Sequence, residues 1–243
     1  MKKTLIILSL ICLISSSVFG DMASAVCPQD FTVYAAEEDG SLSQQKEFNS
    51  RALLSGMKKE MEEADPSDAE QGKDYDVHQL DVMMNVQNAR VFRYEFYAAY
   101  PEVTLAYSPR LTLTAYSKDA SVCTGYRMTL LSEDGGKKRF EELSDATGDI
   151  LDQAGSLSDA AKVRLVRRWI KSRCRYTDTV TNMWDESLYG CLVKGTATCL
   201  GYSEGFYYMM RKLHVPCHIV AEGYHAWDEV YVNGSWEKVD LTR

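Results

Sequence analysis

The sequence has no excess of basic charge. Its 243 residues include 27 Lys and Arg against 35 Asp and Glu, for a formal net charge of -8 at pH 7. A nucleic-acid surface needs concentrated positive charge, so this balance argues against a nucleic-acid partner. The chain also has no internal repeat, no low-complexity tract and no Pro- or Ser-rich linker. These absences leave an ordinary globular protein of one or two domains, 45% apolar in composition.

No apolar run reaches the ~20 residues that a membrane-spanning helix needs. The longest is at the N-terminus, where Met1–Lys3 precedes the apolar Leu5–Ile14 and a mostly small stretch ends at Gly20. This pattern is typical of a secretory signal peptide, so we expect residues 1–20 to be removed. The mature protein is then expected to be secreted or extracytoplasmic, associated with the cell surface, with no stable membrane span.

No set of four ligands has the spacing of a zinc site. His214, Cys217 and His218, taken with Cys191, come nearest, and we expect neither a metal nor a cofactor. Export would permit disulfides, but their pairing stays open at this point. The cysteines left after signal removal are Cys27, Cys123, Cys174, Cys191, Cys199 and Cys217.

Residues 27–155 mix helical and strand patterns and are expected to form a helix-plus-strand lead-in. A catalytic domain is expected over 156–243, because Gly155 ends one helical pattern and Ser158 suits the N-cap of the next. Helical spacing and strand-type residues predict helices over 48–61, 77–86 and 140–151, and an antiparallel meander over 104–107, 111–116 and 124–131.

Cys199 is predicted to lie at the N-terminus of a helix. Residues 200–213 carry a helical apolar stripe, and the small-residue loop Gly195–Thr198 leads into it. Backbone N–H groups and the helix dipole there favour the nucleophilic thiolate, and the same N–H groups can hold a developing oxyanion. The alternative is a buried structural cysteine that caps a core helix.

A hairpin after residue 224 relates a histidine to an aspartate. Asn233-Gly234 is typical of a two-residue type I′ turn between strands 228–232 and 235–239, and that turn fixes the register. His225 and Asp240 then share a face as diagonal neighbours, within roughly 7–8 Å. A carboxylate there can fix the imidazole tautomer and leave the other nitrogen for a thiol. Separately, each would be an ordinary strand histidine and a solvated strand end.

Three motifs together resemble the bacterial transglutaminase-like superfamily. They are the stretch Leu188–Ser203 around Cys199, the run His225–Trp227, and the strand Trp236–Asp240. The resemblance covers about residues 158–242. It implies an α+β protein with the transglutaminase-like variant of the papain-type fold, in which the nucleophile opens a helix packed on an antiparallel sheet.

The resemblance also implies the chemistry. Cys199 would be the nucleophile, His225 the general base and acid, and Asp240 the residue that orients the histidine. The expected protein is an exported thiol acyltransferase, peptidase or amidase acting on protein or peptide substrates, cell-wall peptides among them, through a Cys199 thioester. Three aromatic residues are expected either to line an acyl-binding cleft or to belong to the core, namely Trp184, Tyr189 and Trp227.

Two departures from the family pattern support an alternative. Arg167-Arg168 stands where members usually carry a histidine-aspartate pair, and Asp240 lies three residues from the last residue, Arg243. A side chain so near a chain end is expected to hold His225 loosely. The alternative function is a catalytically inactive, transglutaminase-like binding module at the cell surface.

Overall fold

The computed structural model describes residues 33–36, 42–45, 56–59, 62, 74–75, 79–107, 110–115, 121–129 and 136–243. The expected signal peptide and most of the predicted helix over 48–61 lie outside these residues. Within the described ranges, none of the helices combines the length and the apolar character that a bilayer crossing requires.

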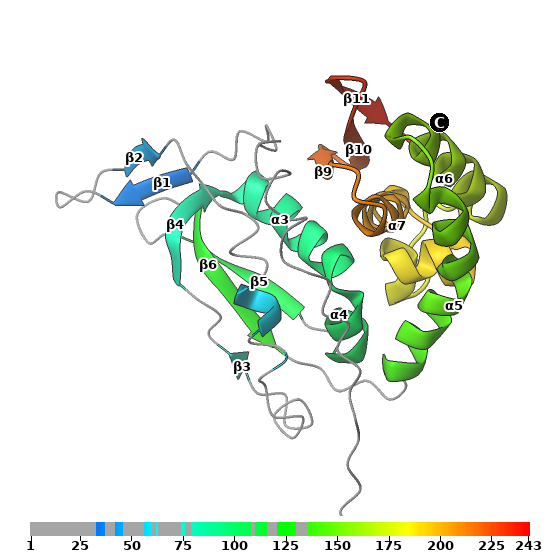
Figure 1. The fold of residues 1–243 in the computed structure, drawn as a ribbon. Helices are drawn as coiled ribbons and strands as arrows, with labels where there is room; N and C mark the ends of the chain where they lie inside the picture. The colour runs from blue at the N-terminus through cyan, green and yellow to red at the C-terminus, as the bar shows by residue number, and fades with distance from the viewer. Residues whose placement is uncertain are drawn as a thin grey trace, which may run out of the picture.

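An antiparallel sheet and two helices form the described N-terminal half. The sheet has the strand order β2-β1-β4-β6-β3, and β5 also pairs with β6. Helices α3 and α4 lie between this sheet and the C-terminal half (Figure 1). The elements are β1 (Val33–Ala36), β2 (Leu42–Gln45), β3 (Asp74–Tyr75), β4 (Gln79–Asn85), α3 (Val86–Ala99), α4 (Pro101–Tyr107), β5 (Arg110–Ala115) and β6 (Val122–Thr129).

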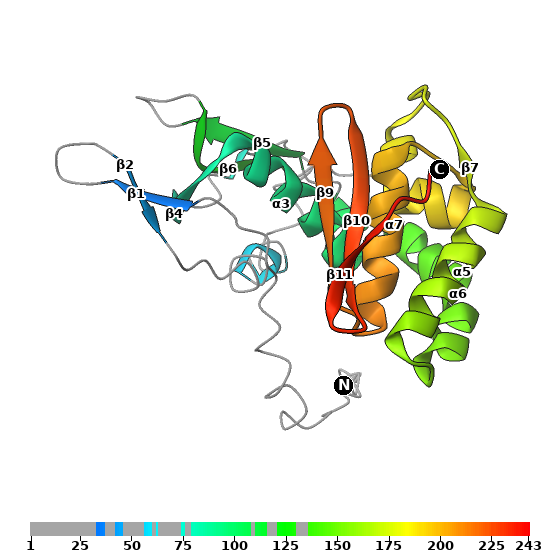
Figure 2. The ribbon, with the colours of Figure 1, turned by 90° about the horizontal axis from the view of Figure 1, so that it is seen from above.

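Helix α7 is the centre of the C-terminal half. It lies between the antiparallel sheet β11-β10-β9 and helices α5 and α6 (Figure 2). Every residue from Gly201 to Met210 on α7 is buried. The elements are α5 (Gly136–Gly155), α6 (Asp159–Arg173), β7 (Arg175–Tyr176), η2 (Met183–Glu186), η3 (Gly190–Lys194), β8 (Thr196–Ala197), α7 (Cys199–Lys212), β9 (Cys217–Glu222), β10 (His225–Val232) and β11 (Ser235–Val239).

The predicted hairpin is confirmed with its register. Tyr231 pairs with Trp236 across the two strands, as the two-residue turn requires. Asn233 and Gly234 both have positive φ, at 54° and 84°, which is the backbone of a type I′ turn. The mixed helix and sheet content also confirms the predicted α+β class. The hairpin therefore presents His225 at the start of β10, with Asp240 directly after β11.

Two local predictions are wrong. The segment predicted as a helix over 77–86 is mostly strand β4, because Met83 and Met84 pair with β1, a long-range contact that helical spacing cannot reveal. The segment 104–107, predicted as a strand, belongs to helix α4. Pro101 suits the first position of that helix, and the Thr104 hydroxyl donates to a carbonyl one turn back.

One hydrophobic core joins the two halves. Leu143 and Ile150 on α5 belong to the same buried cluster as Val166 on α6 and Phe206 on α7. Ala98 on α3 belongs to it as well. Buried contacts thus run across Gly155, and the division at that residue stays a prediction.

Helix α3 closes the open edge of the C-terminal sheet. The Glu95 carboxylate is 5% exposed and accepts a hydrogen bond of 3.0 Å from the N–H of Ile219 on the edge strand β9. About two helical turns before it on α3, Gln87 donates to the carbonyl of Ala221. Burial raises the pKa of Glu95 to about 8, although the Ile219 N–H and the charge of Arg211 act to lower it.

Replacing Glu95 with glutamine is expected to flatten the pH dependence of stability. The pKa of Glu95 is about 8 in the folded chain against an ordinary 4.5. Between these two pH values, the folded chain keeps a proton that the unfolded chain releases. The free energy of unfolding should therefore fall as pH rises, by up to about 1.4 kcal/mol per pH unit. Glu95→Gln keeps an oxygen acceptor for Ile219 and removes the titration.

Urea unfolding at about pH 5 and about pH 8 measures this effect. The variant should match the wild type at the lower pH and exceed it at the higher one. Glu141→Gln, at an exposed position on α5, is the matched control and should change stability by less than about 0.5 kcal/mol at either pH. Equal slopes in the wild type and Glu95→Gln would contradict the assignment.

Candidate active site

Cys199 is the first residue of α7, where the sequence predicts it. The loop before it turns sharply at Gly195, which has φ of 72° and would place a Cβ 2.9 Å from the Arg173 carbonyl oxygen. Only glycine fits that conformation without strain. Thr198 follows with extended backbone and takes the N-cap position, so the first backbone N–H groups of α7 lie next to the thiol.

The short helix η2 supports this loop through Asp185. The Asp185 carboxylate accepts hydrogen bonds from Thr181 and Asn182, through both backbone N–H groups and both side chains. The bonds from the Thr181 backbone and hydroxyl contribute most to holding the pKa of Asp185 below its usual value. The Asp185 carbonyl in turn accepts the N–H of Thr198 at 2.7 Å. Asp185 thereby holds Thr198, the residue directly before Cys199, in place.

His225 and Asp240 are in direct contact. The Nε2 atom of His225 lies 2.9 Å from Oδ2 of Asp240. The Thr242 backbone N–H and hydroxyl donate to the other carboxylate oxygen at 3.2 and 2.8 Å. Burial raises the pKa of Asp240, but the hydrogen bonds from His225 and Thr242 outweigh it and lower the pKa overall. The ring of His225 is thus held through one nitrogen, which leaves Nδ1 for chemistry.

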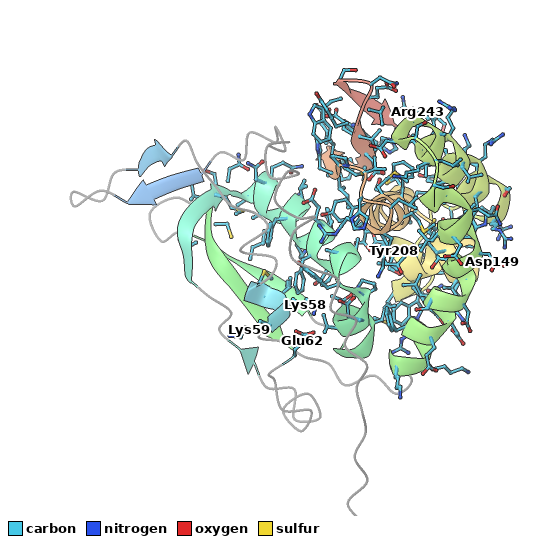
Figure 3. All side chains as sticks on the ribbon, viewed as in Figure 1. Lys58, Lys59, Glu62, Asp149, Tyr208 and Arg243 are labelled. Carbon is cyan, nitrogen blue, oxygen red and sulfur yellow. The ribbon has the colours of Figure 1, made fainter. Side chains whose placement is uncertain are left out.

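The end of the described chain is well anchored. Arg243, labelled in Figure 3, lies with its Nε 3.4 Å from Asp240 Oδ2. The carbonyl of Arg243 also accepts a hydrogen bond from Lys171 on α6. The expected loose hold of Asp240 on His225 is therefore not what the structure shows.

The thiol and the hairpin meet in the structure. The Sγ atom of Cys199 lies 3.9 Å from the carbonyl oxygen of Tyr224, the residue directly before His225. Tyr176 lies close to both Cys199 and Asp240. Burial and then the charges of Cys199, Asp178 and Asp240 raise the pKa of its hydroxyl. Sequence spacing does not show this proximity, which the family resemblance implied.

A buried contact also joins the helix of Cys199 to the strand of His225. Asp228 on β10 is 1% exposed and hydrogen-bonds to the hydroxyl of Ser203 on α7. Burial raises the pKa of Asp228 well above its ordinary value, against the lowering effect of its bonds to Ser203 and Cys217. Helix α7 and strand β10 are thus held together about one helical turn after Cys199.

Two of the predicted substrate residues, Tyr189 and Trp184, pack against each other, and of the two Tyr189 is buried and Trp184 partly exposed. Tyr189 is only 2% exposed, and its hydroxyl donates to Glu142 on α5. Burial and that bond raise the pKa of Tyr189 to about 12. Trp184 packs edge-on against Tyr189, with 5.1 Å between ring centroids, and Arg139 covers its ring at 4.8 Å. The structure therefore places Tyr189 in the core, where it does not line a cleft.

Trp227 lies beside the histidine. The ring centroids of His225 and Trp227 are 5.8 Å apart, and the ammonium of Lys238 lies 3.7 Å from the Trp227 centroid. Among the described residues, its buried indole N–H has no hydrogen-bond partner. Trp227 is thus the one aromatic residue of the predicted set that packs against the His225 ring.

Tyr176 and Tyr224 are site neighbours that the sequence reasoning assigned no role. Tyr176 is 45% exposed and Tyr224 is fully exposed. Gly223, with φ of 58°, forms the turn that presents Tyr224, and such a glycine before a candidate histidine is the available sequence signal.

Within the described residues, no group of three or more His, Cys, Asp or Glu is placed to hold a metal ion.

Comparisons with known proteins found a family model that matches the C-terminal segment and similar solved structures. A family model described as the transglutaminase-like superfamily matches residues 149–241. A solved structure of a TGase is similar with a TM-score of 0.38 and 15% identity, over 55% of this chain and 44% of that chain. A candidate cysteine protease from Cytophaga hutchinsonii is similar with a TM-score of 0.35 and 16% identity, over 55% and 62%. The chain thus spans less than two thirds of either protein, and no curated protein matches it.

Proposed function

We propose that this chain, whose residues 149–241 match the model of the transglutaminase-like superfamily, is a thiol acyltransferase or peptidase that acts on amides. One observation carries the proposal. The Cys199 thiol lies against the residue preceding His225, and Asp240 already engages the far nitrogen of that histidine. These two contacts support a group of nucleophile, base and orienting carboxylate, which covalent amide chemistry requires.

In the proposed reaction, Cys199 sulfur attacks the carbonyl carbon of an amide while Nδ1 of His225 takes the thiol proton. Backbone N–H groups at the start of α7 stabilise the oxyanion. The carbon–nitrogen bond then breaks, and His225 returns the proton to the departing amine. Asp240 stabilises the imidazolium while it exists. The product of this half-reaction is a thioester on Cys199.

The second half-reaction decides the activity. If water attacks the thioester with His225 as base, the products are a carboxylic acid and the regenerated thiol. If a primary amine attacks instead, the product is a new amide. Both outcomes use the same three side chains, and the choice depends on which acceptor reaches the thioester first.

The proposed substrates are amides of proteins or peptides, including cell-wall peptides. Exposed aromatic side chains beside the thiol support a polypeptide substrate, because Tyr176 and Tyr224 offer flat apolar surfaces to its side chains. The N-terminal pattern of residues 1–20 supports an extracytoplasmic, cell-surface location.

Product analysis with glutamine-containing peptides tests this function. Wild-type protein should release ammonia or new peptide ends, and an added primary amine should be incorporated if transfer occurs. Cys199→Ala should abolish both products, because the proposed thioester forms on the Cys199 sulfur. Cys217→Ala is the matched control, since Cys217 is also partly exposed, and it should keep the activity.

A different outcome would favour the alternative. If the wild type forms no product from any peptide while wild type and Cys199→Ala bind peptides equally well, the protein is a binding module that retains the fold. Loss of activity in Cys217→Ala together with Cys199→Ala would point to a folding effect in place of catalysis.

A further inference from the structure

Two cysteines outside the proposed catalytic group lie in contact with each other. Cys174 ends helix α6 as its C-cap, and Cys191 is the second residue of η3. Their side chains are hydrogen-bonded to one another. Exposed fractions of 7% and 2% place both thiols in the core, behind α7.

The backbone at both positions is held in place. The N–H of Cys174 bonds to the Ile170 carbonyl at 2.9 Å, and the carbonyl of Cys174 accepts the hydroxyl of Tyr202 on α7. Cys191 packs on the same helix at Gly205, where an added Cβ would lie 3.1 Å from the Cys191 sulfur. The absence of a side chain at residue 205 thus leaves the room that the Cys191 sulfur occupies. Both cysteines are thus held against the same helix, and both are free thiols in the structure.

We propose that Cys174 and Cys191 form a disulfide, made by exchange with a small-molecule or protein disulfide while the chain folds. In the first step, the Cys174 thiolate attacks one sulfur of the donor disulfide and releases one donor thiol. In the second step, Cys191 attacks the Cys174 sulfur of this mixed disulfide and releases the other donor thiol. The pair loses two protons and two electrons, and the donor disulfide is reduced to two thiols.

The environments of the two thiols support Cys174 as the first to attack and Cys191 as the second. The hydrogen bond from Cys191 is the main cause that lowers the pKa of Cys174, whereas burial raises the pKa of Cys191. A thiol with a lowered pKa attacks a disulfide more readily at neutral pH. Cys174 is also the more exposed of the two in the folded chain, at 7% against 2%.

The bond would brace the segment that flanks the catalytic thiol. Residues 175–190 lie between the two cysteines and include Tyr176, which neighbours Cys199, and Asp185, which fixes Thr198. Closing a loop of this size removes freedom from the unfolded chain. The proposal leaves Cys199 as a thiol and does not depend on whether the protein is an enzyme.

Peptide mapping of the full-length protein, expressed in an oxidising compartment and purified without reductant, tests the pairing. The protein is unfolded in N-ethylmaleimide at mildly acidic pH, which stops further exchange, and is then digested with trypsin. Each cysteine of the C-terminal half falls on a separate peptide, namely 174–175, 176–194, 195–211 and 213–238. The expected species is 174–175 joined to 176–194, lighter by two hydrogens than the two peptides together. The same species should form in Cys199→Ala.

Thermal unfolding provides a second measurement on intact protein. Reduction with a phosphine should lower the Tm of the wild type by roughly 6–12 °C, given the usual stabilisation by a disulfide over a loop of this length. Cys174→Ala and Cys191→Ala should show no such loss on reduction. Cys217→Ala is the matched control and should show the full loss.

Two results of the peptide mapping would overturn the proposal. One is maleimide on both Cys174 and Cys191 in protein that has been equilibrated with oxidised glutathione during refolding. The other is a linked species that joins Cys191 to Cys199 or Cys217 in place of Cys174. An unchanged Tm on reduction of the wild type would exclude any stabilising disulfide at this position.

Discussion

Asp240→Asn is expected to lower kcat for amide substrates by about 10²- to 10⁴-fold, with little change in KM. Nε2 of His225 lies 2.9 Å from the carboxylate, and this contact leaves Nδ1 as the nitrogen that would serve the thiol. An amide at position 240 can present an N–H to that nitrogen, which favours the wrong tautomer and gives no charge to stabilise the imidazolium. The substitution hardly changes volume, so binding of the substrate should survive.

Steady-state kinetics with the best peptide substrate measure this effect. Asp152→Asn, an equivalent change at an exposed position on α5, is the matched control and should leave both constants unchanged. A loss in kcat of less than about fivefold in Asp240→Asn would mean that the carboxylate is structural and does not orient the base.

Gly190→Ala is expected to destabilise the folded chain by more than about 4 kcal/mol or to prevent folding. A Cβ at residue 190 would lie 2.0 Å from the Trp184 carbonyl oxygen, 2.8 Å from its carbon and 3.0 Å from the Thr196 carbonyl oxygen. All three atoms belong to backbone that supports the Cys199 loop, so no side chain can move aside to relieve the overlap. The chain from η2 to β8 would have to shift.

Gly148→Ala is the matched control for this effect. Gly148 lies inside helix α5, and an added Cβ there has no atom within 4 Å. Alanine at that position should stabilise the helix by about 0.5–1 kcal/mol because glycine disfavours helix interiors. Urea unfolding of both variants gives the comparison, and a Gly190→Ala protein within about 1 kcal/mol of the wild type would refute the close approach.

Local chemistry made part of the site predictable from the sequence. Asn233 and Gly234 dictate one turn type, and that turn sets the strand register, which in turn puts His225 and Asp240 on one face. The start of α7 was predictable for a similar reason, because a small-residue loop precedes a strong apolar stripe at Cys199. In both cases the decisive interactions lie close together along the chain.

Long-range packing explains what the sequence did not reveal. The contact of Cys199 with Tyr224 depends on how α7 packs against β10, and only the family resemblance pointed to it. The support that Asp185 gives to Thr198 comes from a loop without any periodic pattern. Tyr189 was a plausible cleft residue by type, yet burial against α5 decides its role. Residue type alone does not distinguish a core aromatic from a surface one.

The most direct test of the central claim, that Cys199 is a nucleophile served by His225, is to trap its acyl-enzyme. The protein is mixed with a glutamine-containing peptide, quenched in acid and digested. The mass of the peptide 195–211 is then measured by mass spectrometry. The expected result is a mass gain equal to the acyl group of the substrate, reversed by hydroxylamine and strongly reduced in His225→Ala. Turnover of the peptide with no adduct on 195–211, or an adduct that forms as fast in His225→Ala as in the wild type, would contradict it.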